Sequence, residues 1–139
     1  MSNARDERDW LQNNPDGENR VPEKVYSPAE EVGDMHFSSE NFTPAIEYFH
    51  KALESAEISA DPDKFRILLK ICDCHRQKGN YDLAQESLDA ASELSASFES
   101  DEVLSKVEYR RAYLLLTRGH YDDALRTSFN AYRKLKNSD

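Results

Sequence analysis

Cysteine is scarce in this sequence, which has only Cys72 and Cys74 among 139 residues. Small secreted scaffolds depend on several well-separated cysteines, so the sequence excludes a disulfide framework. Glycine and proline are also few, with four and five residues respectively. Their scarcity disfavours loop-rich and β architectures, and together with 32% charged residues it predicts a helical protein.

Positive charge and long apolar runs are lacking as well. Eighteen Lys and Arg stand against 27 Asp and Glu, which gives a formal net charge of −9. This charge repels phosphate backbones and anionic lipid, so we expect neither nucleic acid nor a membrane as a partner. No stretch nears the roughly 20 apolar residues of a membrane span, and the N-terminus lacks the apolar core of a secretory signal. We therefore expect a cytoplasmic location.

The length of the chain suits a single domain. Residues 1–26 have little apolar periodicity, and Trp10 and Leu11 are the main hydrophobes of the first twenty. We expect a flexible N-terminal arm there. The helical domain, 27–139, is expected to begin where Ser27 can cap a helix, Pro28 suits its first position and Glu30 can complete a capping box.

A six-residue motif then occurs three times. Its copies are Glu40–Ala45, Gly79–Ala84 and Gly119–Ala124, which align without gaps and share an aromatic third residue and a final alanine. Apolar residues follow each copy at three- and four-residue spacing, the pattern of an amphipathic helix, and another helical stretch precedes it. The sequence therefore predicts three antiparallel helix pairs, at about 28–39 with 43–57, 62–78 with 81–95, and 101–118 with 121–136.

Small residues occur on both helices of each predicted pair, where close contact between two helix axes requires them. On the first helices they are Gly33, Cys72 and Ala112, and on the second helices Ala45, Ala84 and Ala124.

The small residues, the turn, the aromatic and the alanines resemble the tetratricopeptide repeat (TPR), from Ser27 to roughly Lys136. The resemblance implies an all-α, right-handed α-solenoid of three antiparallel helix pairs, a TPR-like superhelix with repeats 27–60, 61–99 and 100–139. Successive motifs are 39 and 40 residues apart. This exceeds the family's usual ~34, so we expect long helices. Glu40 departs from the pattern, because glycine is usual at that place in the turn.

The third repeat departs further, because Glu108 and Arg111 occupy positions that the family fills with large apolar residues. Their three-residue spacing lets them meet as a partly buried ion pair. The alternative is a small helix rotation that exposes both side chains to solvent.

The segment Cys72-Asp73-Cys74-His75 raises the question of a metal or redox site. Residues two apart on a helix point about 200° from one another, so both thiolates cannot reach one ion. Packing explains Cys72 and His75 better, and we expect no metal, no cofactor and no catalytic residue. A helical enzyme or metal protein that uses Cys72, Cys74 and His75 remains the less favoured alternative.

A binding surface is better supported, because the first helix of each pair lines the concave face of such a solenoid. The candidate peptide-binding residues on these helices are Arg66, Lys70, Asp73, Arg76, Lys106, Tyr109, Arg110 and Tyr113. They predict a basic, aromatic groove for an extended or helical peptide that bears carboxylates. The plain alternative is a solvated charged face. Lys106 and Arg110 resemble part of the family's carboxylate clamp, but Glu30 and Asp34 replace other residues of the clamp, so we expect no true clamp.

The last predicted helix carries Leu125, Phe129, Tyr132 and Leu135, and a terminal solenoid repeat exposes such residues unless something covers them. Three explanations are open: a fragment of a longer repeat protein, which we favour, self-association through this helix, or an arm that folds back with Trp10. The resemblance implies a non-catalytic adaptor, scaffold or sensor in signalling that binds a protein or peptide. The alternative is an oligomerisation or regulatory segment of a larger signalling or transcription-regulator protein.

Overall fold

The computed structural model describes residues 24–137. Most of the expected arm, with Trp10 and Leu11, lies outside the described residues. The described part contains six helices and no strand. The helices are α2 (Pro28–Ser38), α3 (Phe42–Glu54), α4 (Asp61–Gln77), α5 (Tyr81–Ser95), α6 (Asp101–Thr117) and α7 (Tyr121–Asn137).

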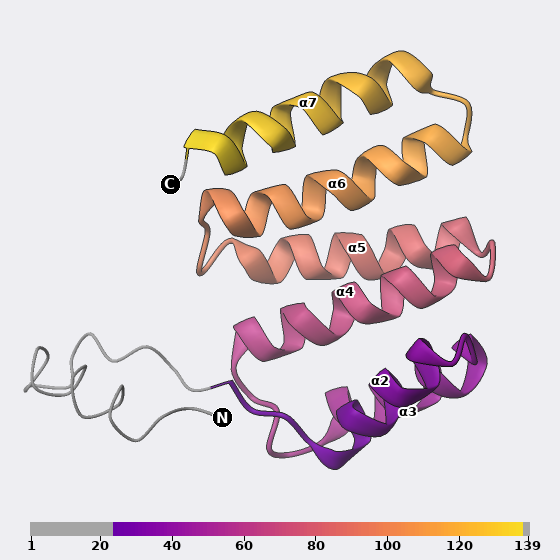
Figure 1. Cartoon of the computed structure of the whole chain (residues 1–139). Helices are drawn as coiled ribbons and strands as arrows, with labels where there is room; N and C mark the ends of the chain where they lie inside the picture. The colour runs from indigo at the N-terminus through magenta and orange to yellow at the C-terminus, as the bar shows by residue number, and fades with distance from the viewer. Residues whose placement is uncertain (1–23, 138–139) are drawn as a thin grey trace, which may run out of the picture.

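The helices form three antiparallel pairs that stack one on the next, from α2 and α3 at one end to α7 at the other (Figure 1). Contacts within a pair are more extensive than contacts between pairs, as a repeat solenoid requires. The predicted pairing is therefore confirmed. The clearest difference in bounds is at α3, which ends at Glu54 because Ser55 turns into extended backbone.

The three motif turns have one geometry. The first residue of each motif has a left-handed backbone conformation, with φ of 60° at Glu40, 78° at Gly79 and 82° at Gly119. The amide of the following residue then donates to a carbonyl near the end of the preceding helix, as Asn80 does to His75 at 2.8 Å. Each turn thus satisfies carbonyls that a helix end leaves free, and it sends the chain back antiparallel.

The start of α2 only partly follows the prediction. Ser27 Oγ accepts a hydrogen bond from the Glu30 amide at 3.2 Å, so Ser27 is the N-cap. The Glu30 carboxylate does not return to Ser27 and complete a capping box. It instead binds Arg66 and Lys70 on α4, because two cations outcompete one backbone amide for a buried carboxylate.

Close contact between paired helices occurs at the predicted small residues, all six of which are buried. Two apolar clusters form the core. One joins α3 and α4 around Phe49 and Ile71, and the other joins α4, α5 and α6 around Leu88 and Leu114. Among the described residues no helix is both long and apolar enough to cross a bilayer.

Candidate binding groove

The first helices of the three pairs lie beside one another and are joined by ion pairs. Glu30 on α2 binds Arg66 on α4 at 2.7 Å, and Asp73 on α4 binds Arg110 on α6 at 2.9 Å. The partners are about one repeat apart in sequence. These bonds run across one face of the solenoid, and they place α2, α4 and α6 in a single layer.

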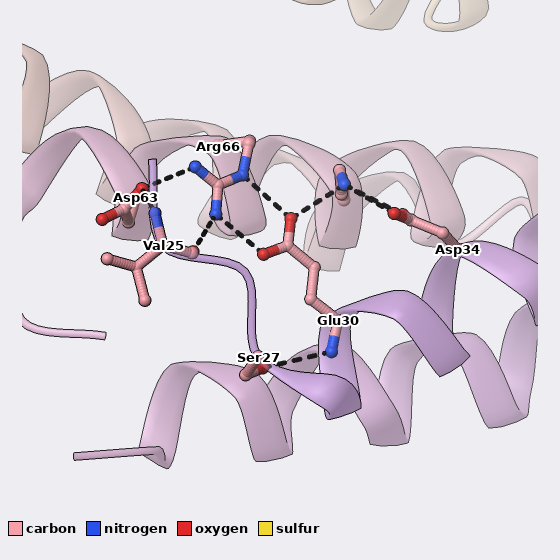
Figure 2. Close-up of polar contacts among 7 residues, drawn as sticks. Val25, Ser27, Glu30, Asp34, Asp63 and Arg66 are labelled. Carbon is pink, nitrogen blue, oxygen red and sulfur yellow. Dashed lines mark hydrogen bonds and ion pairs between the residues drawn. The ribbon is translucent and has the colours of Figure 1, made fainter. Parts of the chain in front are cut away.

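Glu30 is the centre of the bonds between α2 and α4, and its side chain is fully buried (Figure 2). Its Oε1 accepts from Arg66 Nη2 at 2.7 Å, and its Oε2 accepts from Arg66 Nε at 2.9 Å and Lys70 Nζ at 2.8 Å. Lys70 also binds Asp34, and Arg66 also binds Asp63. We call Glu30, Asp34, Asp63, Arg66 and Lys70 the Glu30 network.

The charges of the Glu30 network hold one another ionised. Burial alone would raise the pKa of Glu30, but hydrogen bonds from Arg66 and Lys70 outweigh it and lower that pKa below the ordinary value. The hydrogen bond to Glu30 raises the pKa of Arg66. Burial alone would lower the pKa of Lys70, but its bonds to Glu30 and Asp34 outweigh burial and raise that pKa. All three groups therefore stay charged at neutral pH.

The Glu30 network also binds the residues before α2. Arg66 Nη2 donates to the Val25 carbonyl at 2.8 Å, and the Val25 amide donates to Asp63 Oδ1 at 3.2 Å (Figure 2). The Arg66 guanidinium lies 4.3 Å from the centre of the Tyr26 ring. Val25 and Tyr26, which we expected to belong to the arm, therefore pack against α4.

A cavity of about 320 Å³ opens between the N-terminal halves of α4 and α6. Its apolar lining consists of Ala60, Pro62, Phe65, Leu69, Phe98 and Val103. Its polar lining consists of Lys24, Asp63, Arg66, Lys70, Lys106 and Arg110. Phe65 and Leu69 are buried and form the floor, while the cations stand around it. We call this cavity the inner pocket.

Comparison with known proteins bears on the second helix pair, whose α4 lines one side of the inner pocket. A family model, described as the tetratricopeptide repeat, matches residues 65–98. The matched segment spans most of α4, the turn and all of α5. Residues 65–98 therefore form a tetratricopeptide repeat, within a chain of TPR-like helical pairs. Such repeats generally mediate protein–protein interactions and are typically non-catalytic. No curated protein matches the chain.

The eight candidate residues separate into three groups. Arg66, Lys70, Lys106 and Arg110 line the inner pocket. Tyr109 and Tyr113 line a second hollow of about 400 Å³ between α6 and α7. Asp73 and Arg76 lie between the two and bridge helices: Asp73 binds Arg110, and Arg76 lies 4.3 Å from the centre of the Tyr113 ring.

Within residues 24–137, four of the five cations of the inner pocket, all except Lys24, are held in ion pairs and are not the free charges that a basic groove would require. Arg66 and Lys70 bind Glu30, and Arg110 binds Asp73 through two bonds of 2.9 Å. Lys106 is the most exposed of the four, at 51%, and its ion pair with Glu102 spans 3.4 Å on its own helix. Of these four, Lys106 is therefore the cation that a ligand can bind with the smallest loss of existing contacts.

The two cysteines point away from each other. Cys72 packs in the cluster of α4, α5 and α6, and Cys74 packs in the cluster of α3 and α4. Burial raises the pKa of Cys72 to about 11 and that of Cys74 to about 12, so neither is a thiolate at neutral pH. Burial lowers the pKa of His75. In the described part of the chain, no three His, Cys, Asp or Glu residues are placed to hold a metal ion.

Glu108 forms an ion pair, but not with Arg111. Its carboxylate binds Lys134 on α7, so this pair joins the two helices of the third repeat rather than two turns of one helix. Glu108 is only partly buried, with 22% of its side chain exposed. The position that the family fills with an apolar residue thus holds a charged contact across the pair.

Sequence reasoning missed a second contact that recurs along the solenoid. In each case the residue just after the first helix of a pair binds a residue near the start of the second helix in the pair before it. Lys78 binds Thr43 at 2.7 Å, and Arg118 binds Asp82 at 3.1 Å. Both cations directly precede a motif glycine, so the repeat alignment itself held the signal.

Proposed function

We propose that this chain is a non-catalytic adaptor or sensor module whose inner pocket binds a segment of another protein. The observation that carries the proposal is the inner pocket itself, an apolar floor ringed by cations on α4 and α6. Its polar groups stabilise the stacking of the helices, and the nearby thiols are buried and protonated, so the pocket presents a surface rather than a reactive group.

The lining of the pocket favours one class of segment. Phe65 and Leu69 offer an apolar contact, and five cations around them stand against Asp63 alone. Most of these cations already have carboxylate partners, so long-range charge supplies only part of the affinity. A segment that inserts an apolar side chain and places a carboxylate beside Lys106 satisfies both features. We propose such an acidic segment, from a partner in a signalling assembly, as the ligand.

Selection from a random peptide library displayed on phage tests this function. We expect enrichment of peptides in which an acidic residue flanks a large apolar one. Lys106→Glu should weaken the binding of a selected peptide about fivefold to tenfold in a fluorescence titration, because an exposed attractive pair becomes repulsive.

The matched control is Arg126→Glu on α7, which reverses another exposed cation that pairs within its own helix. It should leave peptide affinity unchanged. A library that yields no binder, or binders that respond equally to both variants, would contradict the assignment of the inner pocket as the binding site.

A further inference from the structure

Helix α7 has two apolar faces, and only one of them packs on α6. Ala124 and Ala131 face α6 and are buried. Tyr121, Leu125, Phe129 and Tyr132 lie on another side, and between 54% and 72% of each is exposed. Their spacing of three and four residues makes them one continuous stripe along the helix. We call these four residues the α7 stripe.

The apolar surface continues from α7 onto α6. The hollow of about 400 Å³ runs between the two helices, with Tyr109, Tyr113 and Leu116 on one wall and Tyr121 and Leu125 on the other. The three residues of α6 are 40% to 48% exposed. A contiguous apolar patch of two helices is unusual on a protein surface and marks a place where another surface binds.

The charges of α7 indicate what that other surface is. Asp122 and Asp123 lie in the first turn, and Lys134 and Lys136 lie in the last. Among the described residues no ion pair involves Asp122 or Lys136. If a second α7 packed antiparallel, the acidic start of each helix would face the basic end of the other, at two equivalent places. The helix is thus complementary to itself, whereas a parallel pairing would oppose like charges.

We propose that the α7 stripe is an interface between two copies of this chain, related by a two-fold axis near Ser128 and Phe129. In this register Leu125 of each copy faces Tyr132 of the other, and Asp122 faces Lys136. The inner pocket is lined from α4 and α6 at their N-terminal halves, so each copy keeps its own pocket. The dimer then presents two pockets, which raises its avidity for a partner with two binding segments.

Exchanging the charges of Asp122 and Lys136, which face each other across the axis, tests the proposal. Each variant is measured at several protein concentrations. By sedimentation velocity, we expect the wild type to shift from monomer to dimer as concentration rises. Asp122→Lys alone and Lys136→Asp alone should each weaken the dimer by about tenfold or more, because each places like charges together twice. The double variant Asp122→Lys with Lys136→Asp should recover most of the loss.

A second substitution tests the apolar part. Phe129→Asp should leave a monomer with an unchanged helical circular dichroism spectrum, since the side chain is 57% exposed. Leu83→Asp on α5, which replaces another exposed apolar residue, is the matched control and should leave the dimer intact. A chain that stays monomeric, or a dimer that is insensitive to Phe129→Asp and not restored by the charge exchange, would overturn the proposal.

Discussion

At the scale of single residues, small side chains decide how closely the helices of a pair approach. Gly33 is the extreme case. A Cβ atom placed on it would lie 2.6 Å from Phe49 Cε1, well inside van der Waals contact. Phe49 is itself fully buried among the residues of α3 and α4, so its ring has little room to move. Glycine at position 33 is therefore a packing requirement, and the freedom of its backbone is secondary.

Gly33→Ala should lower the free energy of unfolding by about 1 kcal/mol. Alanine ordinarily stabilises a helix by about that amount relative to glycine, but the overpacking against Phe49 costs about 1–3 kcal/mol. Urea denaturation of the purified chain measures the net effect. Combining the substitution with Phe49→Leu should make Gly33→Ala less harmful than it is alone. A stabilised single variant would contradict the assigned contact.

At the scale of elements, the three turns share a left-handed residue that ends the first helix of each pair. Gly79 and Gly119 adopt this conformation without steric cost, whereas Glu40 carries a side chain there at φ 60°. A Cβ at Gly79 or Gly119 would meet nothing within 4 Å, so backbone conformation alone sets the preference for glycine. The first turn therefore stores strain that the other two lack.

Glu40→Gly should raise the free energy of unfolding by about 1 kcal/mol, because a non-glycine residue in this region costs about 1–2 kcal/mol and the Glu40 side chain is exposed. Thermal and urea melts of the variant provide the measurement. Gly79→Ala, the reverse change in an equivalent turn, should be destabilising by a similar amount. Equal stability of wild type and Glu40→Gly would show that the turn accommodates glutamate without strain.

At the scale of the whole molecule, ion pairs between successive repeats join the first helices into one layer. The Glu30 network links the first repeat to the second, and Asp73 with Arg110 links the second to the third. Glu30 has no exposed surface, so the loss of its charge would leave Arg66 and Lys70 without their shared partner. The ion pairs between the first and second repeats therefore depend on one carboxylate, in addition to the apolar cluster that joins α3 and α4.

Stability should fall in acid because of Glu30. Its pKa is lowered in the folded chain, so its contribution is complete above the ordinary value of 4.5 and is lost as the pH falls through the lowered value. Glu30→Gln should cost about 3 kcal/mol at neutral pH, and the gap between variant and wild type should shrink below pH 4.5. Urea midpoints at several pH values measure that gap.

Asp34→Asn is the control for this experiment. The Asp34 side chain is 46% exposed, and among residues 24–137 its ion pair is with Lys70, so its loss should cost less than about 1 kcal/mol. A gap between Glu30→Gln and wild type that stays constant from neutral to acid pH would contradict the role of the Glu30 charge.

The sequence by itself determined the helices and their pairing. Turn residues, small contacts and apolar periodicity act within about one repeat, and all three copies carry the same signal, so the six helices follow from local patterns. The residues of the candidate groove could be predicted only in part, because residue spacing shows which side chains share a face of a first helix. Half of its eight candidate residues meet at the inner pocket.

Only the tertiary structure decided which charges meet. Glu30 fitted a local capping box equally well in sequence, and Arg111 was the nearest partner for Glu108, yet both carboxylates bind cations on another helix. With 27 acidic and 18 basic residues, many different ion pairs between helices are compatible with the sequence. The stacking of the repeats selects among them, because it alone sets which side chains of distant turns come within hydrogen-bond distance and lose water together.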